Sequence, residues 1–159
     1  MPDVKSSAPD FTLYDTDKIQ RTLSAYRGKS VVLAFYPAAF TGTCTKEMCS
    51  FRDALVEFDA LDAVVLGISV DPVFSNKAYK EKLELNFPLL SDFNRDVIKK
   101  YDVEFPNHGG IEGYVAAKRS VFIIDPKGNL AYRWIAEHPG VEPDYSEIKE
   151  ALSKINAPS

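Results

Sequence analysis

Residues 31–44 read VVLAFYPAAFTGTC, in which an apolar strand runs into a short turn and the turn into a cysteine, Cys44. Residues 30–36 form an apolar run of the kind found in a central strand that is covered on both faces of a sheet. Residues 45–58 carry apolar side chains at helical spacing, which predicts a helix. Cys44 therefore lies where a helix begins, close to free backbone N–H groups and to the positive end of the helix dipole. A cysteine in such a place ionises more readily than a free one.

The rest of the chain alternates predicted strands and helices. Two short segments, 11–13 and 19–21, flank a polar turn and predict an N-terminal hairpin. Further strands are predicted at 63–70, 89–91, 120–124 and 130–134, and further helices at 72–85, 95–101 and 144–155. Residues 102–118 show no period and contain Pro106 and three glycines, which predicts a long loop.

This order of elements indicates the fold class. Parallel strands joined by helices, followed by a hairpin and a closing helix, indicate an α/β sandwich. The order fits a thioredoxin-like fold with an N-terminal β-hairpin extension and a central mixed sheet flanked by helices. The length of 159 residues favours a single domain over 1–159.

Composition excludes several functional classes. The net charge is −4 and no basic stripe is present, so nucleic acid is not an expected partner. The longest apolar stretch, 31–40, is too short to span a bilayer, and residues 1–7 lack the apolar core of a secretory signal. Two cysteines are too few for a disulfide framework, so free or redox-active thiols in a cytoplasmic protein are expected.

Four residues far apart in the chain form one recognisable set. Pro37, Thr41 and Cys44 occupy the spacing Pro-x-x-x-Thr-x-x-Cys, and Arg119 immediately precedes the predicted strand at 120–124. This set resembles the signature of the peroxiredoxins, and the resemblance extends from about residue 8 to residue 134. It implies a thiol-dependent peroxidase that reduces hydrogen peroxide and organic hydroperoxides.

The chemistry of peroxide reduction explains these residue types. A thiolate, here that of Cys44, must attack the O–O bond while negative charge builds on the leaving oxygen. The backbone N–H groups near Thr43 and the hydroxyl of Thr41 are expected to polarise the peroxide oxygens, because preorganised donors in a dry site supply a large catalytic effect. Arg119 would hold a permanent positive charge near the sulfur and contact a peroxide oxygen.

Two further residues complete the predicted site. Pro37 has no N–H group, so its ring can screen the pocket from water without offering a competing donor. Glu47 lies one turn after Cys44, and the family resemblance implies that it orients basic groups near the site. Each residue also has an ordinary structural explanation. Thr41 could be a helix N-cap, Pro37 a turn residue and Arg119 a charge at a strand edge. Glu47 could be an acidic residue that the helix dipole favours in the first helical turn.

Cys49 is the expected resolving cysteine. Attack on peroxide leaves Cys44 as a sulfenic acid that must be reduced again. The pattern Cys-x-x-x-x-Cys is similar to the peroxiredoxin Q (bacterioferritin-comigratory) branch, which implies an intramolecular disulfide that a thioredoxin-like or other dithiol donor reduces. Five residues along a regular helix place two Cα atoms roughly 8–9 Å apart. A disulfide needs less than about 7 Å, so the helix would have to unwind.

Two other interpretations stay open. Residues 67–72 and 117–121 resemble the alkyl hydroperoxide reductase E branch, whose members often work with one cysteine. Cys49 would then be a small apolar residue, and an external thiol would reduce Cys44. A redox-switched chaperone or signalling protein would instead use oxidised Cys44 as a switch and consume one equivalent of peroxide.

No cofactor or metal is expected. Cys44 and Cys49 have poor spacing for zinc, and the two histidines lie far from them in sequence. His108 falls in the predicted loop and reads as a solvated residue, and His138 precedes Pro139-Gly140 and reads as a turn. The resemblance also allows a homodimer.

Overall fold

A computed structural model describes residues 2–156 of the chain. Met1 and residues 157–159, which the predicted domain includes, lie outside the described residues. The strands are β1 (Thr12–Tyr14), β2 (Gln20–Thr22), β3 (Ser30–Phe35), β4 (Ala63–Ser69), β5 (Leu89–Ser91), β6 (Glu104–Phe105), β7 (Ala116–Ala117), β8 (Ser120–Ile124) and β9 (Leu130–Ile135). The helices are α1 (Gly42–Ala60), α2 (Val73–Leu83), α3 (Asp96–Lys100) and α4 (Tyr145–Asn156), with 3-10 turns η1 (Leu23–Tyr26) and η2 (His108–Gly110).

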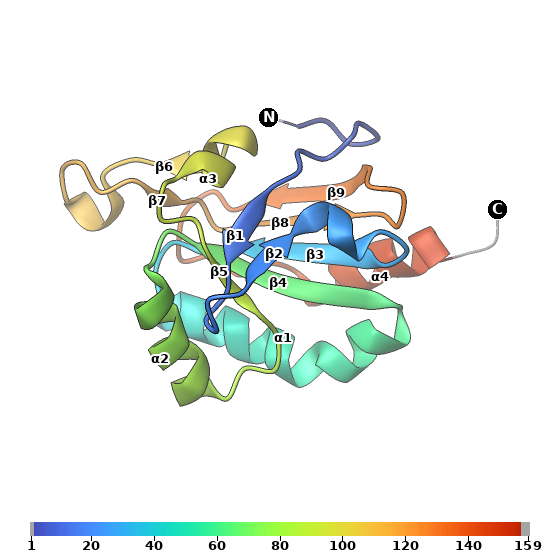
Figure 1. Ribbon diagram of the computed structural model, residues 1–159, viewed down its shortest axis with the longest axis horizontal. Helices are drawn as coiled ribbons and strands as arrows, with labels where there is room; N and C mark the ends of the chain where they lie inside the picture. The colour runs from blue at the N-terminus through green and yellow to red at the C-terminus, as the bar shows by residue number, and fades with distance from the viewer. Residues whose placement is uncertain (1, 157–159) are drawn as a thin grey trace.

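A seven-stranded mixed sheet forms the centre of the fold, in the order β2-β1-β5-β4-β3-β8-β9 (Figure 1). The central strand β3 runs parallel to β4 and antiparallel to β8. Every residue of β3 is buried, as expected for a strand covered on both faces. The predicted α/β class and the central mixed sheet flanked by helices are confirmed.

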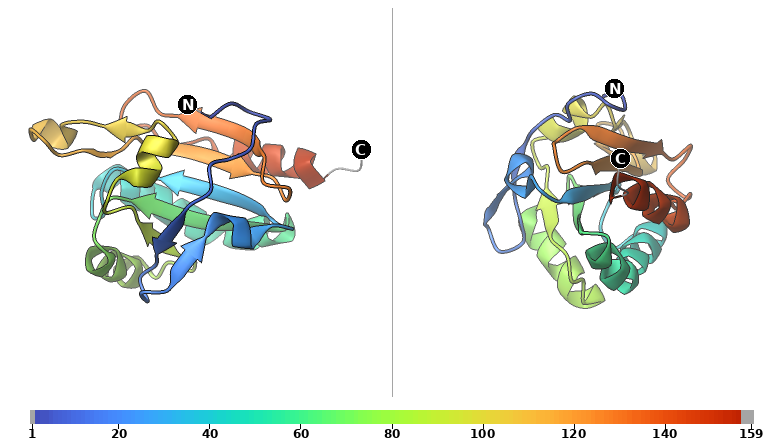
Figure 2. Two further views of the ribbon diagram at one scale, coloured as in Figure 1. Left: turned by 45° about the horizontal axis from the view of Figure 1, so that its top comes forward. Right: turned by 90° about the vertical axis from the view of Figure 1, so that its right-hand side faces the viewer.

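Helices cover both faces of this sheet (Figure 2). The even-numbered residues of β3 pack in one hydrophobic cluster with α1, α2 and α4. The odd-numbered residues pack in a second cluster with α3 and η1. This alternation follows from the two-residue period of a strand. Within residues 2–156 no helix has both the length and the apolar character needed to cross a membrane.

Most predicted elements are found within one or two residues. β1 and β2 form the N-terminal antiparallel hairpin, with Thr12 opposite Thr22. Helix α1, however, begins at Gly42 and not at 45. The sequence did not indicate this first turn, because Gly42 and Thr43 line a pocket and lack the apolar period that marks the rest of the helix.

The segment 102–118 is not the structureless loop that the sequence predicted. β6 pairs with β7 and η2 lies at the tip, so the segment forms a short hairpin that projects from the body (Figure 1). Strands of two residues are too short to give a detectable period. The positive φ angles of Gly109 and Gly110, 65° and 77°, make the tight tip accessible without strain.

Neighbouring elements fix the turn that joins β3 to α1. The backbone N–H of Tyr36 donates to the Ile68 carbonyl at 3.0 Å, and the Tyr36 hydroxyl donates to Asn76 Oδ1 at 2.8 Å. The N–H of Ala39 donates to Asp71 Oδ2, also at 2.8 Å. β4, α2 and the loop between them therefore hold both ends of this turn before α1 begins.

Candidate active site

Cys44 lies in the first turn of α1 and is fully buried. The helix has Thr41 at its N-cap position, and the N–H of Thr45 donates the first helical bond to the Thr41 carbonyl at 3.0 Å. The N–H groups of Thr43 and Cys44 precede that bond and have no acceptor within the helix. No acidic residue lies in the first turn, so the positive end of the helix dipole faces the sulfur undiminished.

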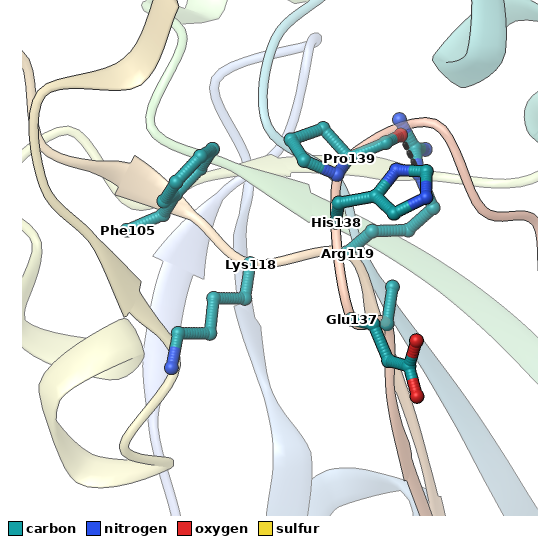
Figure 3. Close-up of a pocket in the computed structure, with 7 residues that line it drawn as sticks. Phe105, Lys118, Arg119, Glu137, His138 and Pro139 are labelled. Carbon is teal, nitrogen blue, oxygen red and sulfur yellow. Dashed lines mark hydrogen bonds between the residues drawn. The ribbon is translucent and has the colours of Figure 1, made fainter.

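Arg119 joins the thiol to two other parts of the chain. Its Nη2 donates to Cys44 Sγ at 3.0 Å, its Nη1 donates to Glu47 Oε1 at 3.0 Å, and its Nε donates to the Pro139 carbonyl at 2.9 Å. Figure 3 shows the guanidinium beside Pro139, with the last bond dashed. Only 3% of Arg119 is exposed. Burial lowers the pKa of Arg119, but Glu47 and Cys44 raise it above its ordinary value, so the group stays charged.

Glu47 is also fully buried, and its Oε2 has no hydrogen-bond partner among the described residues. Burial raises the pKa of Glu47 to about 8, against the lowering effect of Arg119, and the charge of Glu142 adds to the rise. The site therefore holds one fixed cation that hydrogen-bonds both the Cys44 sulfur and the Glu47 carboxyl. Two anions beside one buried cation would leave a net charge in a dry environment, which is unfavourable.

A pocket of about 170 Å³ opens above this cluster. It is lined by Pro37, Thr41, Gly42, Thr43, His108, Arg119, Pro139 and Gly140. Pro37 is buried and forms part of the wall, as expected from its lack of a donor. The Thr41 hydroxyl donates to the Ala38 carbonyl at 2.9 Å, so its lone pairs, and not its proton, are free to meet a ligand.

A second cavity of about 280 Å³ adjoins the first and shares Arg119 and Pro139 with it. In Figure 3, Phe105 and Lys118 lie across this cavity from Glu137. The two openings thus meet where Arg119 and Pro139 lie.

The structure does not bring Cys49 next to Cys44. Both cysteines are free and both belong to the continuous helix α1, in which their spacing corresponds to a Cα separation of roughly 8–9 Å. Cys49 is half-buried, so its sulfur is neither a fully packed core group nor an open surface thiol.

Two predictions about the histidines have different outcomes. The interpretation of His108 as a solvated loop residue is wrong, since it is half-buried and lines the pocket above Cys44. Sequence reasoning missed it because only the pairing of β6 with β7 folds the segment back over the site. His138 does lie in a turn, where its Nδ1 accepts from the Gly140 N–H at 3.2 Å. Within residues 2–156 no group of three or more His, Cys, Asp or Glu residues is placed to hold a metal ion.

Comparison with known proteins identifies the family. The sequence pattern of the AhpC/TSA family matches residues 4–133. This chain belongs to the AhpC/TSA family. The resemblance to the peroxiredoxins, a family of thiol peroxidases, is thereby confirmed.

Relatives of this peroxiredoxin come from both branches that the sequence suggested. Alkyl hydroperoxide reductase E of Mycobacterium tuberculosis is 38% identical over 160 residues, which cover 99% of this chain and 100% of the relative. Peroxiredoxin Q, chloroplastic, of Oryza sativa subsp. japonica is 40% identical over 127 residues, 80% of this chain, and the match spans only 56% of the plant protein. The crystal structure of peroxidoxin BcpB from M. tuberculosis has a TM-score of 0.82 and 32% identity, covering 98% of this chain and 97% of that one.

Glu47 makes the stability of this peroxiredoxin depend on pH. Its pKa is about 8 in the folded protein against an ordinary value of 4.5, so the folded chain holds its proton more tightly than the unfolded chain does. The stabilisation is therefore complete below pH 4.5 and is lost as the pH rises through about 8. We expect Glu47→Gln, whose side chain stays neutral, to lose less free energy of unfolding across that window than the parent protein.

Denaturant unfolding at the two ends of the window measures this difference, in a Cys44→Ser background that removes the thiol titration. Glu57→Gln serves as the matched control, because Glu57 is an exposed glutamate of the same helix. An equal pH dependence for Glu47→Gln and its parent would contradict a raised pKa at Glu47.

Proposed function

We propose that this chain reduces hydrogen peroxide and organic hydroperoxides, with Cys44 as the attacking thiolate. One observation carries the proposal: a fully buried sulfur accepts a 3.0 Å hydrogen bond from a buried guanidinium beneath a small pocket. A structural cysteine gains nothing from such a partner, whereas a thiolate is stabilised by it and kept ready to react. Reactive cysteines are typically found in electropositive surroundings of this kind.

The first step is a displacement at oxygen. The thiolate of Cys44 forms a bond to one peroxide oxygen as the O–O bond breaks, which gives the sulfenic acid Cys44–S–OH and an alkoxide or hydroxide that takes up a proton from water. Arg119 and the free N–H groups of the first turn stabilise the charge as it moves from sulfur to oxygen. The lone pairs of the Thr41 hydroxyl accept a hydrogen bond from the hydroperoxide O–H and so orient the substrate.

Glu47 acts through Arg119 and not on the substrate. Its Oε1 holds Nη1, and the Pro139 carbonyl holds Nε, which leaves Nη2 directed at the sulfur. Arg119 thereby offers a positive charge to the Cys44 sulfur in the orientation that a thiolate needs.

For the second half of the cycle, we propose that Cys49 attacks the sulfenic acid and expels water, giving a Cys44–Cys49 disulfide that a thioredoxin-like or other dithiol donor reduces. The separation of the two residues along α1 requires the first turns of the helix to unwind. The alternative is a one-cysteine cycle in which an external thiol takes the place of Cys49. A cytoplasmic location and a homodimer stay predictions.

Replacement of Cys44 and Arg119 tests the peroxidase proposal. We expect the wild-type chain to consume many equivalents of peroxide while a dithiol reductant lasts, and Cys44→Ser to consume none. Arg119→Lys should lower the rate of Cys44 oxidation by about tenfold or more, because an ammonium cannot make the three directed bonds of the guanidinium. Consumption of one equivalent followed by arrest, with reductant still present, would contradict catalysis and favour a redox switch.

Oxidation should change the helix content of this chain. If Cys49 resolves Cys44, one equivalent of peroxide lowers the helical circular dichroism signal, and dithiol restores it. Cys49→Ser is the matched control, which should form the sulfenic acid without loss of helix. An oxidised wild-type protein with unchanged helix content and unlinked sulfurs would establish the one-cysteine cycle instead.

A further inference from the structure

His108 lines the pocket, but the proposed peroxide chemistry has so far given it no role. It comes from the β6–β7 hairpin, which lies more than sixty residues from Cys44 in the sequence. The pocket nevertheless places it in the same wall as Thr41, Thr43 and Arg119. The packing of its ring and the partners of its two nitrogens show whether the side chain is available to a ligand.

Packing, and not hydrogen bonding, orients the imidazole ring. The ring centroid lies 5.4 Å from that of Phe105 and 5.2 Å from that of Tyr114, in edge-to-face arrangements on both sides. The backbone N–H of His108 donates to the Tyr114 carbonyl at 2.9 Å, and Asn107 Oδ1 accepts from the Gly113 N–H at 3.0 Å. The hairpin tip is therefore pinned, and the ring packs against two aromatic side chains.

The two ring nitrogens of His108 differ in their surroundings. Nδ1 is buried and has no hydrogen-bond partner in the described chain. Nε2 also has none within residues 2–156, but it is not buried, so it is the nitrogen that a ligand can reach. A proton on Nδ1 would leave a buried donor unpaired, whereas a proton on Nε2 can be shared with a ligand. We therefore place a proton on Nε2, from which the ring can donate a hydrogen bond into the pocket.

The direction of the displacement places the leaving oxygen near this donor. A thiolate attacks a peroxide in line with the O–O bond, so the leaving oxygen lies on the far side of the attacked oxygen from the sulfur. Cys44 is fully buried, and Arg119, whose Nη2 contacts its sulfur, lines the pocket. A peroxide that reaches the sulfur through this pocket would direct its leaving oxygen back toward the pocket lining, which includes His108.

We propose that His108 is a catalytic residue of the peroxidase reaction, whose Nε2–H donates a hydrogen bond to the leaving oxygen as the O–O bond breaks. This role rests on the proposed function of Cys44. The thiolate forms the S–O bond, the O–O electron pair goes to the leaving oxygen, and the Nε2–H stabilises that negative charge until water supplies the proton. An imidazole N–H suits this work because it can donate a hydrogen bond without giving up its proton.

The basicity of the leaving group supplies the test. Hydroxide from hydrogen peroxide and the alkoxide from tert-butyl hydroperoxide are strongly basic and gain much from a donor, whereas acetate from peracetic acid gains little. We expect His108→Leu, which keeps the bulk of the ring without a donor, to oxidise Cys44 about tenfold or more slowly with the first two substrates. Its rate with peracetic acid should change little. His108→Gln keeps an N–H donor and should recover most of the lost rate.

Rapid-mixing measurement of Cys44 oxidation on the full chain gives the three rate constants for each variant. The rate with peracetic acid is the internal control, because a variant whose pocket is merely distorted would be slowed with that substrate as well. Equal slowing of His108→Leu with all three substrates would mean that His108 only shapes the pocket, and an unchanged rate with all three would exclude any role. Either result overturns the proposal. Failure of the wild-type chain to oxidise Cys44 with any substrate would instead overturn the peroxidase function itself.

Discussion

The three hydrogen bonds of the buried Arg119 guanidinium are the interaction on which the rest of the site depends. They tie the first two turns of α1 to the loop that carries Pro139, and they leave a single nitrogen aimed at the Cys44 sulfur. A buried guanidinium must have counter-charges and acceptors, since an unpaired charge in a protein interior is costly. The need to satisfy Arg119 therefore positions Glu47, Cys44 and the Pro139 carbonyl together.

The sheet explains how residues 75 positions apart come to meet. β3 and β8 are antiparallel neighbours, and Phe35 at the end of β3 lies opposite Ser120 at the start of β8. The residue before β8 is consequently delivered to the place where β3 ends and the turn to α1 begins. Parallel pairing of these two strands would have placed Arg119 at the other end of the sheet. The chemistry of the site thus follows from one strand register.

Much of this arrangement was predictable from the sequence, and the rest was not, for physical reasons. Local sequence signals predicted the correct structure where they exist. They are the apolar run of β3, the helical period of α1 and the spacing of Pro37, Thr41 and Cys44 at the turn between them. The hydrogen bonding of the Thr41 hydroxyl and the unpaired Oε2 of Glu47 depend on the positions of single atoms. The location of His108 depends on two-residue strands whose pairing leaves no periodic pattern.

The central claim is that Arg119 holds Cys44 as a thiolate. The most direct test is the ultraviolet absorbance of the thiolate at neutral pH, compared between Cys49→Ser and the double variant Cys49→Ser/Arg119→Met, so that only one thiol contributes. We expect removal of the guanidinium to lower the fraction of Cys44 present as thiolate, with the fold retained. An unchanged thiolate fraction in the folded Arg119→Met protein would contradict it.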